Sequence, residues 1–201
     1  MRRAVDLAGQ CVTEPERNDE SPKVGAVAVG ADGEFLGESY RGALRPGDHA
    51  EYCLITQIGD GLGRLAGATV YTTLEPCTYR HSPKIPCAQR LIREGVAVVY
   101  IGMLDPDPRV RELGWKALGQ AGIERRDFTA DLREEVLELN APFVEGFRTA
   151  RGPTGTIRFD YMQNADRQRQ RGALRNQLEH GWVRVDPCRW PSRQLGARKD
   201  C

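Results

Sequence analysis

A continuous apolar run, VAVVYIGM (96–103), constrains the fold of this chain more than any other feature of its sequence. Such runs are typical of strands buried on both faces, because half-exposed strands alternate apolar and polar residues. Amphipathic helices are predicted on either side of the run, over 87–95, where Gly95 ends the helix, and over 109–121. The run therefore predicts an inner strand of an α/β protein.

The remaining patterns extend this strand into a layered domain. Apolar residues at helical spacing predict three more helices, over 2–12, 49–58 and 130–147. β-rich runs predict two more strands, over 67–74 and from 122 onward. Two extended segments around Asp32-Gly33 predict a hairpin over 24–40, and Asp48 is the expected N-cap of the helix over 49–58. This order predicts a sheet that begins as a hairpin and becomes parallel.

The net charge of +1 hides an asymmetry along the 201 residues. Residues 1–150 hold 18 basic against 23 acidic residues, whereas residues 151–201 hold 11 against 5. The Gly-, Pro- and Thr-rich stretch 148–155 predicts a linker between a domain over 1–147 and a basic extension over 156–201. We expect that extension to be a solvated helix face or a disordered end. Binding of nucleic acid, with Trp182 and Trp190 stacking on bases, is the alternative.

The distribution of apolar and polar residues also bears on the cellular location of the protein. No apolar run approaches the length of a membrane span, and the first 15 residues are too polar for the core of a signal peptide. We therefore expect a cytoplasmic protein without membrane contact, whose cysteines stay reduced. Cys11 and Cys53 lie on apolar helical faces, where small core residues are expected.

Three potential metal ligands stand at predicted element ends. His49 opens one helix, Cys77 follows a strand, and Cys87 opens another helix. A disulfide, a metal site and buried thiols are all compatible with one cysteine pair, but a reduced pair together with a histidine favours a metal. One nitrogen and two sulfurs suit Zn²⁺, with a fourth position left for water. Glu51, two residues after His49, is then placed to transfer protons rather than to bind the ion.

The longer motif TLEPCTYRHSPKIPC (73–87) resembles the corresponding segment of the RibD-type pyrimidine deaminases of riboflavin biosynthesis. Three further segments resemble that family in the same order: SPKVGAVAV (21–29), IGMLDPDPRV (101–110) and LNAPF (139–143). The resemblance spans roughly residues 2–147 and implies a cytidine-deaminase-like, three-layer α/β/α fold with a mixed sheet of about five strands. It also implies Zn²⁺ bound by His49, Cys77 and Cys87, Glu51 as the proton shuttle, and a homo-oligomer, most simply a dimer.

The chain also departs from the family pattern. Ser21 replaces an asparagine, Asp107 replaces another, and Tyr40 or Arg41 lies where a substrate-contacting histidine is expected. About fifty residues follow the linker, too few for the reductase domain that a full RibD protein carries. The candidate substrate-binding residues are Ser21, Tyr40, Glu75, His81, Lys84, Asp105 and Asp107.

Four of these candidates also have a simpler interpretation. Asp105 and Asp107 each precede a proline and could only shape a turn. Glu75 could orient the site from behind the ligands or form a salt bridge, and His81 could face solvent. Because the departures fall around the pocket, they predict that the riboflavin aminopyrimidine phosphate is not the best substrate.

Three functions follow from these observations. The first is zinc-dependent hydrolytic deamination of a free aminopyrimidine, nucleoside or nucleotide. The second is deamination of a base in single-stranded nucleic acid, with the basic extension holding the strand. The third is a zinc-stabilised binding module without catalysis.

Overall fold

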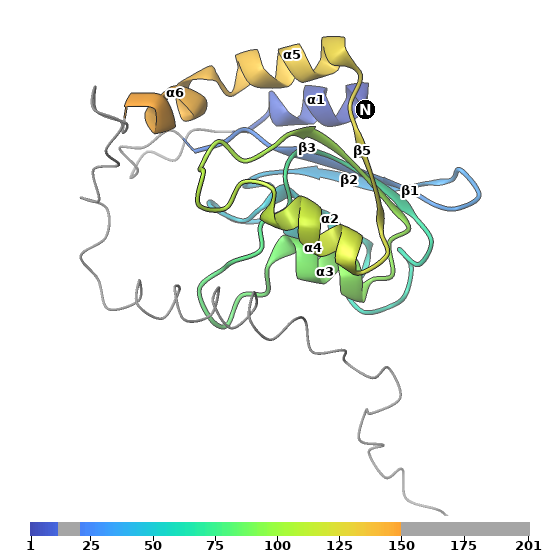
Figure 1. Ribbon diagram of the computed structural model, residues 1–201. Coiled ribbons are helices and arrows are strands. Elements are labelled where there is room, and N and C mark those ends of the chain that lie inside the picture. Colours follow the sequence, from blue (N-terminus) through green and yellow to red (C-terminus); the bar gives the residue numbers. More distant parts are fainter. Residues whose placement is uncertain (12–20, 150–201) are drawn as a thin grey trace, which may run out of the picture. The chain divides into compact units, whose positions relative to one another are not determined.

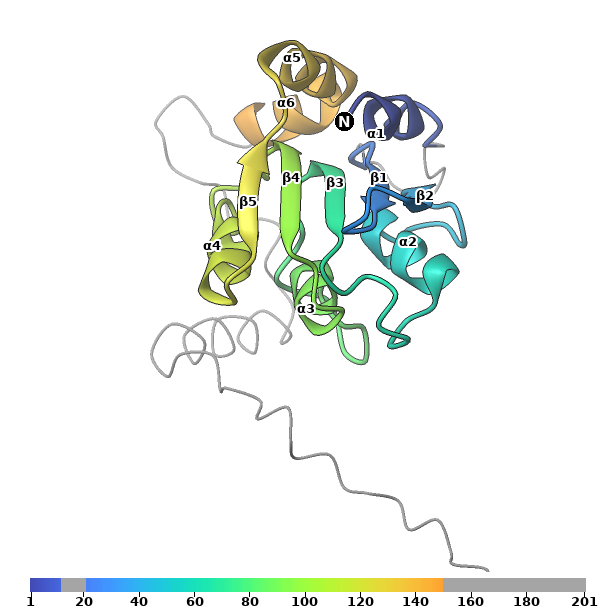
Figure 2. The ribbon, with the colours of Figure 1, turned by 90° about the vertical axis from the view of Figure 1, so that its right-hand side faces the viewer.

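The computed structural model describes residues 1–11 and 21–149 (Figure 1). A five-stranded sheet forms its centre, in the order β2-β1-β3-β4-β5. The strands are β1 (Gly25–Val29), β2 (Phe35–Tyr40), β3 (Thr69–Leu74), β4 (Val98–Met103) and β5 (Glu124–Asp127). β1 runs antiparallel to β2 and β3, whereas β3, β4 and β5 are parallel. The mixed sheet of five strands is confirmed, and Figure 2 shows its strands side by side, from β5 at one edge to β2 at the other.

Helices cover both faces of the sheet. They are α1 (Arg2–Ala8), α2 (Ala50–Ile58), α3 (Cys87–Arg93), α4 (Leu113–Gln120), α5 (Ala130–Leu139) and α6 (Ala141–Thr149). α2, α3 and α4 lie on one side of the sheet, and α1 and α5 lie on the other (Figure 1). The predicted inner strand is β4, in which Val99 and Ile101 are buried. This arrangement confirms the three-layer α/β/α fold.

Several predicted boundaries were wrong. The first helix ends at Ala8 rather than near residue 12, so half-buried Cys11 lies beyond it, where its thiol donates to the Val24 carbonyl at 3.4 Å. His49, not Asp48, is the N-cap of α2, and no side chain caps that end. Cys53 is buried, as expected.

The predicted helix over 130–147 is two helices that separate at Asn140. The predicted helix over 109–121 begins only at Leu113, because Glu112 has a left-handed backbone with φ of 65°. Gly114 then lets α4 approach the loop that carries Cys77: a Cβ at this position would lie 2.1 Å from the Pro76 carbonyl oxygen.

The expected linker reaches into α6, which extends to Thr149. The rest of the linker and the basic extension lie outside the described residues. Within those residues, no helix combines the length and the apolar character that a membrane crossing requires.

Candidate active site

The three predicted metal ligands converge at one end of the parallel strands. His49 precedes α2, Cys77 follows β3, and Cys87 is the first residue of α3. The Nδ1 atom of His49 lies 3.5 Å from each cysteine sulfur, and the three ligand atoms lie within 4.8 Å of one another. A nitrogen and two sulfurs at this spacing are the donor set of a zinc site with an open fourth position. The residues therefore fit the ion that the sequence implied.

The two cysteines also interact directly. The backbone N–H of Cys87 donates to the Cys77 sulfur at 3.4 Å, which fixes the turn between them at the start of α3. Hydrogen bonding from the Cys87 thiol and from His49 holds the pKa of Cys77 well below its ordinary value. The same pairing and burial raise the pKa of Cys87 well above its ordinary value. A lowered pKa favours the thiolate of Cys77, the form of cysteine that binds a metal ion.

Glu51 lies beside this group, in the first turn of α2. Its side chain is only 3% exposed, and burial raises the pKa of its carboxyl above the ordinary value. The hydroxyl of Thr72, a fully buried residue of β3, donates to Glu51 Oε1 at 3.1 Å. A carboxyl with a raised pKa takes up a proton more readily than a free one, which suits a group that accepts a proton and returns it.

A cavity of about 90 Å³ opens next to these residues. His49, Glu51 and Cys77 line it from the metal side. The rest of its lining is mostly apolar with a few charged groups, contributed by Pro22, Val24, Arg41, Ala50, Leu74, Glu75, Asp105 and Phe143. Convergent polar groups in a largely apolar cavity are typical of a small-molecule site.

The acidic candidates have different roles here. Glu75 is buried, and its carboxylate accepts the backbone N–H groups of Asp105, Glu112 and Trp115 at 3.0 to 3.1 Å, so it organises the loop before α4. Asp107 is held by Arg109 through both carboxylate oxygens, at 2.6 to 3.0 Å, and does not line the cavity. Asp105 does line it, and burial raises the pKa of its carboxyl to about 6.

Four other candidates lie away from the cavity lining. Lys84 is exposed and pairs with Asp48 at 3.8 Å, which ties the loop between the cysteines to the residue before His49. His81 is exposed, and its ring packs edge-on against Tyr79. Ser21 and Tyr40 are half-buried, one residue before the lining residues Pro22 and Arg41.

Six lining residues were not among the candidate site residues: Pro22, Val24, Arg41, Ala50, Leu74 and Phe143. Arg41 was considered only as an alternative to Tyr40, although the turn after β2 directs residue 41 to the cavity. Phe143 belongs to the LNAPF segment, which indicated only the end of the domain. The signal that could have found Phe143 is its place on an amphipathic helix next to a polar break at Asn140.

Comparison with known proteins agrees with this geometry. A family model described as the cytidine and deoxycytidylate deaminase zinc-binding region matches residues 1–103. The riboflavin biosynthesis protein RibD of Escherichia coli is 40% identical over 152 residues, which cover 74% of this chain and 38% of the relative. The chain thus spans less than two fifths of the length of such curated relatives.

Solved structures with the same fold include two bacterial proteins. RibD of Acinetobacter baumannii superposes with a TM-score of 0.62 at 32% identity, over 74% of this chain and 39% of the other. The second is a diaminohydroxyphosphoribosylaminopyrimidine deaminase/5-amino-6-(5-phosphoribosylamino)uracil reductase from Thermotoga maritima. It superposes with a TM-score of 0.63 at 28% identity, over 88% of this chain and 52% of the other.

Proposed function

This chain belongs to the cytidine and deoxycytidylate deaminase family, and on that premise we propose that it catalyses the hydrolytic deamination of a small pyrimidine-type amine. One observation carries the proposal: the buried carboxyl of Glu51 lines the same cavity as two of the three zinc-type ligands. A binding module would have no need of an acid in that position.

His49 Nδ1 and the sulfurs of Cys77 and Cys87 would hold the ion. Zinc bound by three protein ligands supplies a Lewis acid that lowers the pKa of water to about 7. Glu51 accepts one proton from the attacking water and delivers it to the ring nitrogen. It then accepts the second proton, from the hydroxyl that the attack leaves on the ring carbon, and delivers it to the amino group, which departs as ammonia while the carbonyl forms. The hydroxyl of Thr72 holds the carboxylate in position for both transfers.

The cavity supports a flat, heteroaromatic substrate. Leu74 and Phe143 supply apolar contact, and Arg41 and Asp105 supply one cation and one acid for polar ring substituents. The Thermotoga maritima protein is named as a deaminase of a phosphoribosylaminopyrimidine, and an amine of that class is a reasonable first substrate.

The expectation that this substrate is disfavoured has lost part of its basis. The carboxylate of Asp107 is neutralised by Arg109, and Ser21 does not line the cavity. Arg41, in place of the expected histidine, remains the one departure in the lining.

Ammonia release from a panel of pyrimidine amines tests the proposal. The panel contains the phosphoribosylaminopyrimidine, cytosine, cytidine, deoxycytidine and their monophosphates. We expect turnover of at least one member by the zinc-loaded protein, and a loss of about 10²- to 10⁴-fold in Glu51→Gln, which keeps the fold and the metal.

Metal analysis supplies the matched control. Cys77→Ser and Cys87→Ser should lose most of the zinc, whereas Glu51→Gln should retain about one ion per chain. Turnover by Glu51→Gln at the wild-type rate, or no turnover of any panel member by zinc-loaded protein, would contradict the proposal.

Two further expectations belong with the proposed function. We propose a homodimer, as is common among cytidine-deaminase-like domains, and a cytoplasmic location, where the ligand thiols stay reduced. Light scattering on the purified full chain checks the first, and fractionation of cells checks the second.

A further inference from the structure

Asn140 separates α5 from α6 and is almost fully buried, with 2% of its surface exposed. Its side-chain amide makes two hydrogen bonds to a single distant residue. Oδ1 accepts the backbone N–H of Lys23 at 2.7 Å, and Nδ2 donates to the Lys23 carbonyl at 3.1 Å. Nδ2 also donates to the Val136 carbonyl at 3.0 Å, which anchors the amide to the last turn of α5.

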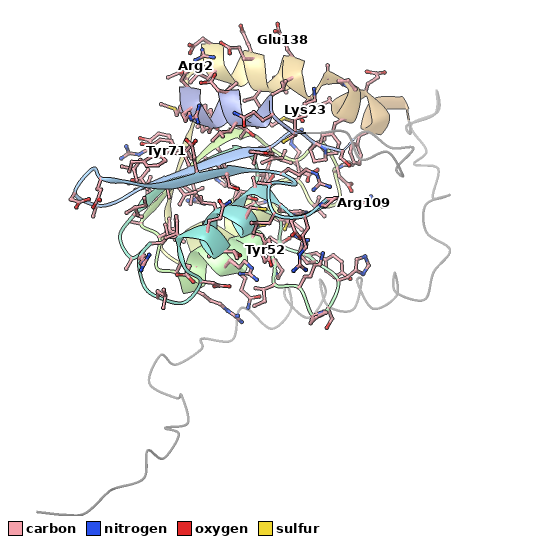
Figure 3. All side chains as sticks on the ribbon, turned by 180° about the vertical axis from the view of Figure 1, so that it is seen from behind. Arg2, Lys23, Tyr52, Tyr71, Arg109 and Glu138 are labelled. Carbon is pink, nitrogen blue, oxygen red and sulfur yellow. The ribbon has the colours of Figure 1, made fainter. Side chains whose placement is uncertain are left out.

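The residue that Asn140 holds lies between two residues of the cavity wall. Pro22 and Val24, on either side of Lys23, both line the cavity. The Val24 carbonyl accepts the backbone N–H of Arg41, another lining residue, at 2.8 Å. Figure 3 shows Lys23 where the strands meet the helices above them. The position of the Lys23 backbone therefore determines the positions of Pro22 and Val24 in the cavity wall.

The other side of the junction also reaches the cavity. Phe143 lies in the first turn of α6, three residues after Asn140, and lines the cavity. The ring of Phe147, one turn later, packs edge-on against it with centroids 5.3 Å apart. Because α6 begins directly after Asn140, the position of Asn140 determines the position of the Phe143 ring.

We infer that Asn140 is a positioning residue for substrate specificity: its amide fixes Pro22 and Val24 relative to Phe143, so that together they form an apolar surface against which a flat pyrimidine ring packs. This inference rests on the proposed function. Asn140 does not line the cavity. Among the described residues, it forms no hydrogen bond with a metal ligand or with Glu51. Its loss should therefore act on binding of the ring more than on the chemical step.

Kinetics of Asn140→Ala in the full-length, zinc-loaded protein test the inference. We expect KM for the best pyrimidine amine to rise about 10- to 100-fold, since small misplacements of positioning groups have effects of this size. The turnover number at saturation should change by less than about threefold, with zinc content unchanged. Asn140→Asp keeps an oxygen acceptor for the Lys23 N–H and serves as a second variant if Asn140→Ala folds poorly; its KM should also rise.

Val136→Ala is the matched control, because Val136 is fully buried in α5, the helix that ends before Asn140, but lines no part of the cavity. It should lower the melting temperature without raising KM. A rise in KM as large as that of Asn140→Ala would show that general loosening explains both and would overturn the inference.

A double-mutant cycle with Phe143→Ala gives the sharpest result. If Asn140 acts by positioning Phe143, the change in KM on removing the ring should be several-fold smaller in the Asn140→Ala background. Effects that simply multiply, or an unchanged KM in both Asn140 variants, would reject the inference.

Hydrogen exchange separates this inference from the proposed function. The Lys23 amide should exchange faster in Asn140→Ala than in wild type, whether or not a substrate is found. A wild-type protein that turns over no pyrimidine amine would reject the proposed function, and the ring-packing role with it. An unchanged Lys23 exchange rate would reject the hydrogen-bonded positioning alone.

Discussion

Thr72 offers Glu51 a partner in both of its protonation states. Its single hydroxyl lies 3.1 Å from Glu51 Oε1 and 3.1 Å from the Leu74 carbonyl. A hydroxyl has one hydrogen to donate and lone pairs to accept with. It can donate to Glu51 when the carboxylate is ionised, and it can donate to Leu74 and accept from Glu51 when the acid holds a proton. A proton shuttle needs both arrangements within one turnover.

We expect Thr72→Val to lower the turnover number by about tenfold, which corresponds to about 1.4 kcal/mol, the scale of one hydrogen bond. The variant keeps the shape of the side chain but leaves the Glu51 carboxyl without this partner. KM and zinc content should stay near wild type, and Thr72→Ser should restore most of the turnover. A turnover number for Thr72→Val within twofold of wild type would remove Thr72 from the mechanism.

Asp105 makes the stability of the protein depend on pH. Burial, more than the neighbouring charges of Asp107 and Glu75, raises the pKa of its carboxyl from the ordinary 3.8 to about 6. A raised pKa means that the folded state binds the proton more tightly than the unfolded state. The resulting stabilisation is complete below the unfolded value of 3.8 and is lost as the pH rises through about 6.

Asp105→Asn should therefore be more stable than wild type above pH 6, by at most about 3 kcal/mol. The asparagine stays neutral at every pH and keeps an oxygen that can accept the Asp107 N–H, a bond of 2.9 Å in the wild type. Denaturant unfolding of both proteins from pH 4 to pH 8 measures the difference, which should shrink as the pH falls toward 4. A difference that does not vary with pH would contradict the raised pKa.

At the scale of elements, Glu75 joins the end of β3 to the start of α4. Its carboxylate binds three backbone N–H groups, two of which belong to the N-cap residue Glu112 and to Trp115 in the first turn of α4. This explains why the helix predicted from residue 109 begins only at Leu113. The pattern of apolar residues could not predict the delay, because the carboxylate responsible lies about forty residues earlier in the chain.

Removing this carboxylate should destabilise the fold strongly. Glu75→Ala leaves three backbone N–H groups without their acceptor in a site where Glu75 is 5% exposed, and we expect a loss of about 2 to 4 kcal/mol in the free energy of unfolding. Glu112→Gln is the control, because it removes only an exposed pair with Lys116 and should change that free energy by less than about 0.5 kcal/mol. Equal effects of the two variants on denaturant unfolding would rule out the role of Glu75.

For the molecule as a whole, the features that contiguous sequence patterns determine were predicted better than the features that contacts between distant residues determine. The apolar run at β4 and the hairpin turn at Asp32-Gly33 are local signals, and they led to the sheet, its mixed direction and its helical layers. The ligand set was predicted because its residue types and element ends carry the chemistry themselves. The break at Asn140 was missed, since its cause is a bond to Lys23, 117 positions away. To predict that Arg41 and Phe143 line the cavity, one would also have to know which distant parts of the chain pack together.

The site is built from residues 22–143, so a chain that ends after Thr149 should keep it. We expect the truncated protein to bind about one zinc per chain and to retain kcat/KM for its best small pyrimidine amine within about threefold.

The full chain also allows the opposite result, because residues 151–201 carry 11 basic residues and two tryptophans. If a base in single-stranded nucleic acid is the true substrate, deamination of an oligonucleotide should exceed that of every small amine and should be lost on truncation. Its binding should also weaken with salt, by about 0.7 in log K per log salt for each phosphate contacted. Oligonucleotide turnover by full-length and truncated protein, measured at 50 and 200 mM salt, distinguishes the two functions, because six phosphate contacts would lose about 300-fold in affinity over that range.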